Sequence, residues 1–410
     1  MMGAEHSNRE AATGIGRALA RLLTALALLV SLFAAPSAQA DANPITIGVT
    51  LGLSGKFAPM AAMSANGYRL WEAHVNAQGG LLGRPVKLII YDDHSDKQRA
   101  IALYEKLINA DRVDLLFGPY SSSVTAAVAP LAERHGYPML AAGAAADTLW
   151  RQGYKHLFGL FIPASRYAVG FLEMIALNGI QHIALVGADD PFSQSILDGA
   201  RDWGRKFGLH VTIEESFHKG EHHLTPLAER LAKAAPEAVI MCGHFDEAVD
   251  LRRALAAVKF SPRAYFATVG PAMESFRERL GAKLAEGVFS SSQWEVGARY
   301  TPNDEEIFLH PFIERFGVTP SYQAADAFAA AQILAYAIRK TGSIERPALR
   351  DQLAKMNAVS IIGHYGVDRN GMQIKHFSLT TQWIQGRKQI VWPEQLASAP
   401  PQFDSLSPLQ

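Results

Sequence analysis

The sequence has little cysteine and no excess charge of either sign. Its single cysteine, Cys242, excludes an internal disulfide, so stability depends on the hydrophobic core. Because Cys242 follows the apolar run 238–241, we expect a buried structural residue rather than a nucleophile. Lysine and arginine together number 39, as do aspartate and glutamate. This balance, with no basic stripe of interleaved aromatic residues, argues against nucleic-acid binding.

The sequence also lacks the short motifs that mark common enzymes and metal sites. No G-x-S-x-G, H-E-x-x-H or P-loop pattern occurs. His218, His222 and His223 cluster in one polar stretch, but no cysteine or clear carboxylate framework accompanies them. We therefore expect a variable loop there, and we predict no catalytic residue, no metal and no cofactor. The protein is predicted not to be an enzyme.

Long apolar runs are missing after residue 40. The apolar run 22–35 follows an arginine-containing stretch and precedes small residues at Ala38 and Ala40. This order is typical of a signal peptide, and the run is shorter than the roughly 20 residues that a membrane span needs. The alternative is an uncleaved membrane anchor. We predict that a signal peptide, residues 1–40, is cleaved after Ala40, leaving a periplasmic chain that does not itself span the membrane.

Apolar and amphipathic segments alternate from residue 45 onward. Strands are expected at 45–49, 86–90, 113–117 and 139–141, with helices at 61–76, 97–109 and 124–135 between them. A second series has strands at 183–186, 210–213, 238–241 and 264–267, and helices at 168–178, 195–207, 224–235 and 246–258. Strand, helix, strand at this spacing predicts parallel sheets with right-handed crossovers. Two such series predict two α/β lobes.

The chain beyond residue 287 holds more elements than the second lobe requires. It offers a strand at 288–289, helices at 324–340 and 346–356, and a β-rich end. We therefore expect the chain to return to the first lobe and then to the second.

One segment resembles a known family. Residues 76–86 (NAQGGLLGRPV) are similar to the link between the first helix and the second strand in the periplasmic leucine/isoleucine/valine-binding proteins of branched-chain amino-acid ABC transporters. The same order continues in LSG at 53–55, YDD at 91–93, GPYSSS at 118–123, PML at 138–140, ADA at 325–327 and QWIQG at 382–386. The likeness spans about residues 43–395.

The resemblance implies a type I periplasmic-binding fold, in which two doubly wound parallel-sheet lobes are joined by three hinge crossovers. Ligands of such sheets bind beyond the carboxyl ends of the strands, at the topological switch point, and the lobes close by rotation about the hinge. The expected organisation is a signal peptide at 1–40, lobe 1 at 41–162, lobe 2 at 163–288, a return to lobe 1 at 289–375, a hinge and closing segment of lobe 2 at 376–398, and a disordered tail at 399–410.

Two loops of the first lobe are candidate ligand contacts. Ser121 and Ser122 lie between a strand and a helix, where hydroxyls and free N–H groups can hold a carboxylate at the positive helix end. The alternative is an ordinary helix cap. The resemblance implies that these serines contact ligand, and that Gly143, Ala144 and Ala145 form a second ligand loop. Ala145 stands where the family often has a threonine, so only backbone groups remain to bind there.

Three residues of the second lobe correspond to ligand contacts of the family. Phe192 occupies the place of a ligand-stacking tyrosine, and His244 occupies that of a second tyrosine. Gly270 lies near the place of the glutamate that pairs with the ligand's ammonium. An ammonium buried without a carboxylate is poorly paired. Either Asp189 or Asp190 replaces that glutamate, or the ligand is not a standard α-amino acid.

Met60 and Tyr120 complete the candidate site, because with Phe192 they would supply an apolar wall. Ser121 or Ser122 with His244 could form a catalytic dyad, but the two are expected on opposite lobes and the sequence offers no third residue to orient the imidazole.

These expectations favour a solute-binding protein of an ABC importer, acting as a monomer. It would close two lobes on a small carboxylate-bearing ligand, either an apolar or aromatic carboxylate or an amino acid, and deliver it to the membrane subunits of the transporter. One alternative is a ligand-sensing protein of the same fold that signals to a membrane partner. Another is an α/β hydrolytic enzyme. The sequence identifies neither the ligand nor the transporter.

Overall fold

The computed structural model describes residues 43–406. The predicted signal peptide, with its cleavage after Ala40, lies outside the described residues, as does the end of the predicted tail at 407–410. None of the helices in the described part is long and apolar enough to cross a membrane.

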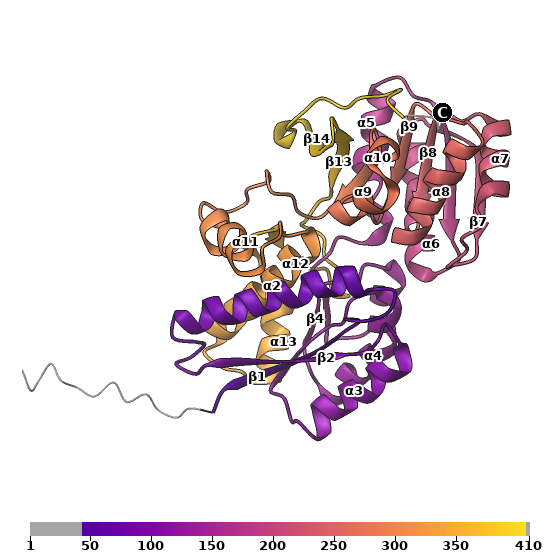
Figure 1. Cartoon of the computed structure of the whole chain (residues 1–410). Coiled ribbons are helices and arrows are strands. Elements are labelled where there is room, and N and C mark those ends of the chain that lie inside the picture. Colours follow the sequence, from indigo (N-terminus) through magenta and orange to yellow (C-terminus); the bar gives the residue numbers. More distant parts are fainter. Residues whose placement is uncertain (1–42, 407–410) are drawn as a thin grey trace, which may run out of the picture. The chain divides into compact units, whose positions relative to one another are not determined.

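The first lobe is built on a five-stranded parallel sheet with the order β2-β1-β3-β4-β5 (Figure 1). Its strands are β1 (Ile45–Leu51), β2 (Val86–Asp92), β3 (Leu115–Phe117), β4 (Met139–Ala141) and β5 (Leu157–Gly159), and its first helices are α2 (Ala58–Ala77), α3 (Lys97–Asn109) and α4 (Ser122–His135). Strand β1 is buried along nearly its whole length, as expected for a parallel strand covered on both faces. It lies between β2 and β3, so the strand order reverses beside it, and this places the switch point at its carboxyl end.

The second lobe is built on a seven-stranded sheet with the order β14-β13-β10-β9-β8-β6-β7. Its strands are β6 (His182–Ala188), β7 (His210–Phe217), β8 (Ala238–Cys242), β9 (Ala264–Ala267), β10 (Phe289–Ser292), β13 (Leu379–Ile384) and β14 (Arg387–Trp392). Its helices are α5 (Val169–Leu177), α6 (Pro191–Lys206), α7 (Thr225–Ala234), α8 (Phe245–Ala257), α9 (Glu274–Leu280) and α10 (Ala282–Ala285). The sheet is parallel from β7 to β10, whereas β13 and β14 add antiparallel pairs at one edge. Strand β6 lies between β7 and β8, which gives this lobe a switch point of its own.

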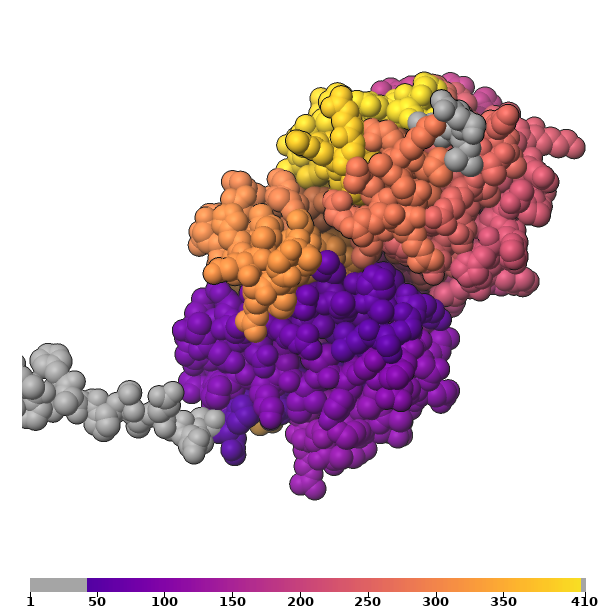
Figure 2. Space-filling model, in the orientation of Figure 1, coloured from indigo at the N-terminus to yellow at the C-terminus, as the bar shows by residue number. Residues whose placement is uncertain are grey.

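The chain returns to the first lobe after β10 through α11 (His310–Phe316), α12 (Tyr322–Thr341) and α13 (Arg346–Lys355), followed by the small hairpin of β11 (Ala358–Ser360) and β12 (Gly363–Tyr365). Helix α12 packs on α2, and a Cβ at Gly67 would come within 2.1 Å of the carbonyl oxygen of Ala324. Only glycine allows this approach of two helices. Figure 2 shows the orange α11 region on the surface of the first lobe and the yellow C-terminal segment on the second.

Side chains link the three crossovers between the lobes. Gln373 donates from Nε2 to the carbonyl oxygen of Leu160 at 3.3 Å, and Gln293 accepts at Oε1 from the amide of Ile162 at 3.4 Å. His376 Nε2 lies 3.0 Å from the carbonyl oxygen of Gln293. Burial lowers the pKa of His376 to about 4, so the imidazole is neutral at pH 7 and donates to that carbonyl. Two α/β lobes joined by three linked crossovers confirm the predicted fold class.

The structure also shows where the segments at the expected domain limits lie. Strand β10 is paired with β9 and β13 in the second sheet, just past the expected limit at 288. Residues 399–406, expected to be disordered, lie along the second lobe, where the amide of Gln402 donates to Gln382 Oε1 at 2.8 Å and Leu406 is buried.

Candidate ligand-binding site

A pocket lies where the carboxyl-end loops of the two sheets face each other. From the first lobe it is lined by Phe57, Met60, Tyr120, Ser121, Ser122, Ser123, Gly143, Phe161 and Tyr322. From the second lobe it is lined by Tyr167, Asp190, Phe192, Lys219, His244 and Val269. The cavity measures only about 30 Å³. Since ligand pockets usually measure about 300–1,000 Å³, its two walls have to separate to admit a ligand.

Ser121 is the N-cap of α4 and lies at the pocket wall. Its hydroxyl accepts from the amide of Val124 at 3.4 Å and lies 3.2 Å from the hydroxyl of Ser123. Its φ of +85° is in the left-handed region, which a serine rarely adopts. Strain of this kind is often found at ligand sites, where the surrounding structure enforces it. The positive end of α4 and hydroxyls with a weak internal bond suit an anion.

Ser122 has a different role, because its hydroxyl holds the neighbouring loop. Its Oγ accepts from the amides of Ala145 and Ala146, both at 3.0 Å. The hydroxyl proton is left to donate, so Ser122 can still bind a carboxylate oxygen while tying the loop.

The loop at 143–146 reaches the pocket only through Gly143. A Cβ at Gly143 would lie 2.7 Å from the ring of Tyr120, so this loop can pack against the tyrosine only as glycine. The carbonyl of Gly143 accepts from the amide of Ser121 at 3.1 Å, and the carbonyl of Ala145 accepts from the amide of Ala164 at 2.8 Å. The backbone groups expected to bind ligand are therefore largely used within the protein. Ala144 and Ala145 are buried behind the pocket wall.

Asp190 is the acidic residue among the described residues that line the pocket. It caps α6, and its oxygens accept from the Phe192 amide at 3.2 Å, the Ser193 hydroxyl at 2.7 Å and His244 Nε2 at 2.9 Å. The ammonium of Lys219 lies 3.5 Å from its Oδ1. Burial opposes ionisation of Asp190, but the hydrogen bond and charge of His244, then Lys219 and Ser193, outweigh it and hold its pKa below the usual range. A carboxylate offers about four lone-pair sites, and four donors surround this one.

Lys219 is the charged pocket residue that the sequence reasoning missed, beside apolar lining residues such as Phe161, Tyr167 and Tyr322. It follows β7, and its amide donates to Asp189 Oδ1 at 2.9 Å, which turns the loop toward the pocket. Asp189 also pairs with His218 at 2.6 Å and is half exposed rather than part of the pocket wall. The signal available in the sequence was position alone, because Lys219, Asp190 and His244 each follow a strand of the same parallel set.

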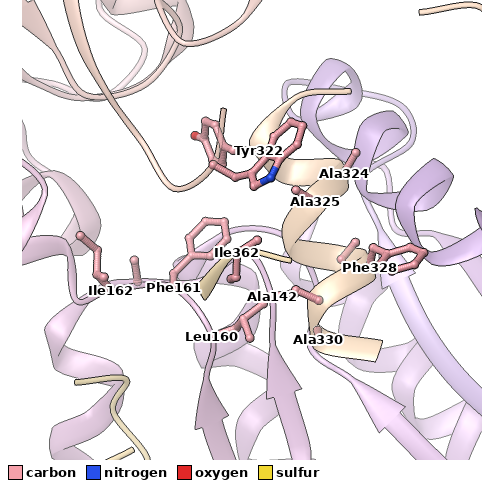
Figure 3. Packing of buried hydrophobic residues seen from close by; sticks show 14 of the residues in the cluster. Ala142, Leu160, Phe161, Ile162, Tyr322, Ala324, Ala325, Phe328, Ala330 and Ile362 are labelled. Atoms are coloured by element: carbon pink, nitrogen blue, oxygen red, sulfur yellow. The ribbon is translucent and has the colours of Figure 1, made fainter. Parts of the chain in front are cut away.

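Aromatic rings form most of the apolar wall. Phe192 packs against His244, with ring centroids 5.4 Å apart, and edge-on against Tyr167 at 5.6 Å. On the first lobe, the ring centroids of Phe161 and Tyr322, which begins α12, are 6.0 Å apart. Both rings lie beside a core of small and apolar side chains (Figure 3). These rings can enclose a flat apolar body between the polar groups of the two lobes.

The structure thus brings together seven of the ten residues proposed from the sequence, namely Met60, Tyr120, Ser121, Ser122, Gly143, Phe192 and His244. Ala144, Ala145 and Gly270 do not line the pocket. Gly270 has a φ of +112°, and its neighbour Val269 faces the pocket instead. Asp190 supplies the group that orients the imidazole of His244, which the sequence did not reveal. The hydroxyls of Ser121 and Ser122 bond to other groups and not to that imidazole.

Two histidines of the stretch after β7 each pair with a different carboxylate. His218 pairs with Asp189 and His222 with Asp250, the latter at 2.7 Å. Within residues 43–406 no group of three metal-ligating side chains is found. Cys242 is fully buried in β8, and burial raises the pKa of its thiol.

Comparison with known proteins places this geometry in a family. Residues 44–388 match the periplasmic binding protein family. A curated relative, "Leu/Ile/Val-binding protein homolog 7" of Brucella suis biovar 1, is 23% identical over 394 residues, which are 91% of this chain and 97% of the relative.

Two solved structures share the fold. The branched-chain amino acid transporter substrate binding protein LivJ from Streptococcus pneumoniae, in complex with isoleucine, has a TM-score of 0.77 at 18% identity and covers 88% of this chain and 100% of its own. A solute-binding protein of an ABC transporter from R. palustris, in complex with benzoate, has a TM-score of 0.74 at 18% identity. The match covers 90% of this chain and 100% of that structure's chain. With two α/β lobes, a pocket at their strand ends and a family match over residues 44–388, the chain belongs to the periplasmic binding protein family, as its segment at 76–86 indicated.

Proposed function

We propose that the protein is the extracytoplasmic binding component of an ABC importer and that its ligand is a small apolar or aromatic carboxylate rather than an α-amino acid. In this role it releases the ligand to the membrane subunits of the transporter. It works without chemical conversion of the ligand, as a binding protein does. The signal peptide is cleaved after Ala40, so intact-mass measurement on the exported protein is expected to give a chain that begins at Asp41.

The observation that carries the ligand assignment is the state of Asp190. An amino acid would bring an ammonium into the closed pocket, and that ammonium needs an acceptor. Asp190 is the acidic group of the described pocket wall, and its lone pairs are directed at Phe192, Ser193, Lys219 and His244. No acceptor capacity remains on it for a ligand.

The carboxylate end of the ligand has a matching partner on the first lobe. The N-terminus of α4 carries Ser121, Ser122 and Ser123 at the pocket wall. A charge-assisted hydrogen bond there is worth about 1.5–3 kcal/mol. The aromatic rings around it favour a flat or branched apolar body. The solved relatives bind isoleucine and benzoate, and both of these ligands carry a carboxylate.

The test is titration calorimetry with matched ligand pairs on the mature protein. Isoleucine is compared with 3-methylpentanoate, phenylalanine with 3-phenylpropanoate, and benzoate is measured beside benzamide. The deaminated acids and benzoate are expected to bind more tightly than the amino acids and the amide. A ligand at 100 times its dissociation constant then adds about 2.7 kcal/mol of stability.

Two results would contradict the proposal. Tight binding of isoleucine without binding of 3-methylpentanoate would mean that the pocket pairs an ammonium, and the ligand would be an amino acid. A chemically altered ligand, recovered by mass spectrometry, would place the protein among enzymes and direct attention to Asp190, His244 and the serines.

A further inference from the structure

A hydrogen bond joins the two lobes beside the pocket. The amide of Asp147, at the start of the short helix η1 (Asp147–Arg151) of the first lobe, donates to the hydroxyl of Ser195 on α6 of the second lobe, at 3.2 Å. Ser195 is buried, and neither residue lines the pocket. The bond therefore links the lobes without belonging to the surface that a ligand touches.

The amide of Asp147 depends on the second lobe for its acceptor. It belongs to the first turn of η1, where N–H groups have no partner inside the helix, and the preceding residue, Ala146, has no side-chain oxygen to cap it. Ser195 supplies this oxygen from the other lobe. Its own hydroxyl proton donates to the carbonyl of Pro191 at 2.8 Å, which leaves the oxygen lone pairs free to accept.

The loop that ends at Asp147 also reaches the candidate ligand site. The hydroxyl of Ser122 accepts from the two preceding amides, those of Ala145 and Ala146, and the hydroxyl of Ser195 accepts from the third. Ser122 lines the pocket at the start of α4. The loop is thus held on one side by a pocket residue and on the other by the second lobe.

The bond crosses the interface that has to open for a ligand. Asp190 and Phe192, at the start of α6, line the pocket, and Ser195 lies one turn further along the same helix. Gly143, at the start of the loop, lines the pocket from the first lobe. Because Asp147 and Ser195 belong to these two walls, separation of the walls breaks their hydrogen bond and lets water reach the amide.

We propose that Ser195 is a latch between the lobes: its hydrogen bond to Asp147 stabilises the closed form and so sets the affinity for every ligand, although Ser195 contacts none of them. In Ser195→Ala the Asp147 amide is unpaired only in the closed form, because water pairs it in the open form. The bond of Ser195 to Pro191 lies within α6, so its loss affects both forms alike. Ser195 is a positioning residue, and the inference goes beyond the proposed function because it holds for any ligand class.

The test is calorimetry of Ser195→Ala with benzoate, 3-phenylpropanoate and isoleucine. Each of these ligands that binds the wild-type protein is expected to bind the variant about tenfold more weakly, which is about 1.4 kcal/mol, and by the same factor. The preference for benzoate over benzamide is expected to match that of the wild-type protein. Ser121→Ala is expected to reduce this preference, because Ser121 contacts the carboxylate in the proposed function.

Two further variants act as controls. Ser195→Thr keeps a hydroxyl at this position and is expected to bind the ligands more tightly than Ser195→Ala. Ser261→Ala removes an exposed hydroxyl of the same lobe and is expected to leave every affinity unchanged. Circular dichroism checks the fold of each variant. Should Ser195→Ala not fold, Ser195→Cys, which replaces the oxygen by a weak acceptor, takes its place.

The outcomes separate the latch from the proposed function. Wild-type affinity in Ser195→Ala overturns the latch, as does a loss that differs from one ligand to the next. If isoleucine binds and the acids do not, the proposed ligand class fails, whereas the latch is still tested with isoleucine. If none of the three ligands binds, small-angle scattering of the ligand-free proteins decides. Ser195→Ala is then expected to have the larger radius of gyration, and equal radii overturn the latch.

Discussion

Ser121 and Ser122 are adjacent, yet the structure predicts that their replacement by alanine has different consequences. The hydroxyl of Ser122 accepts from two buried amides, those of Ala145 and Ala146, at 3.0 Å each. An unpaired buried N–H group costs about 1–3 kcal/mol, so Ser122→Ala is expected to lose at least about 2 kcal/mol of stability. At about 2–4 °C per kcal/mol, this corresponds to a decrease in Tm of about 4 °C or more.

Ser121 contributes less to stability because its cap hydrogen bond to the Val124 amide is long, at 3.4 Å. Loss of a cap usually costs about 0.5–2 kcal/mol, and the length of this bond indicates the lower end of that range. Ser121→Ala is expected to weaken benzoate binding at least tenfold, about 1.4 kcal/mol, with a small change in Tm. Ser121→Gly removes the same hydroxyl but suits the φ of +85°, so it is expected to lose affinity while keeping or gaining stability.

The assays are thermal denaturation without ligand and calorimetry with benzoate. Ser261→Ala, at an exposed serine of the second lobe, is the matched control and is expected to change neither measurement. The reasoning is refuted if Ser122→Ala melts with the wild-type protein, because the loop would then not depend on its hydroxyl. Wild-type affinity in both Ser121 variants would show that this serine is only a helix cap.

Three further predictions follow from buried groups and from the closure of the lobes. Asp326 lies in α12 with neither carboxylate oxygen hydrogen-bonded, and burial raises its pKa well above the usual value. The folded protein therefore favours the protonated carboxyl group. This contribution to stability is fully present below the pKa that Asp326 has in the unfolded chain, and it is lost as pH rises through the folded-state pKa. The free energy of unfolding of Asp326→Asn, relative to that of the wild-type protein, is therefore expected to rise by about 1.4 kcal/mol between pH 5 and pH 6 in urea titrations. The same pH dependence of unfolding in both proteins would contradict this. Cys242 is expected to resist a thiol reagent until the protein unfolds, because burial keeps its thiol protonated; rapid labelling of the folded protein would disprove this. Ligand is expected to lower the radius of gyration in small-angle scattering, and an unchanged radius would argue against closure of the lobes.

Much of the fold could be predicted from the sequence because the signals are local. The helix at 97–109 and the strands at 139–141 and 264–267 have the predicted bounds, since periodicity, cap residues and turns are set by near neighbours. Strand β5 was missed because its three buried residues carry no periodicity of their own. The attachment of the β13–β14 hairpin to the edge of the sheet depends on the pairing of β10 with β13, between residues about 90 positions apart, as Phe289 with Gln382.

The candidate site was predicted in outline for the same reason. The sequence indicates which segments follow strands, and the carboxyl ends of parallel strands gather at one edge, so Ser121 could be placed near a ligand. Phe192 and His244 were placed there by the resemblance to the leucine/isoleucine/valine-binding proteins. The direction of each side chain within those loops was decided by partners distant in the sequence. Ser122 is turned to the loop after β4 by two amides 23 and 24 residues away. Asp189 anchors the loop that brings Lys219 to the pocket, and Asp190 is occupied by that lysine and by a histidine 54 residues away. The sequence by itself determined the two lobes and the edge where they bind, whereas only the tertiary structure decided which charges are left for a ligand, because hydrogen bonding between distant loops settles which groups are already paired.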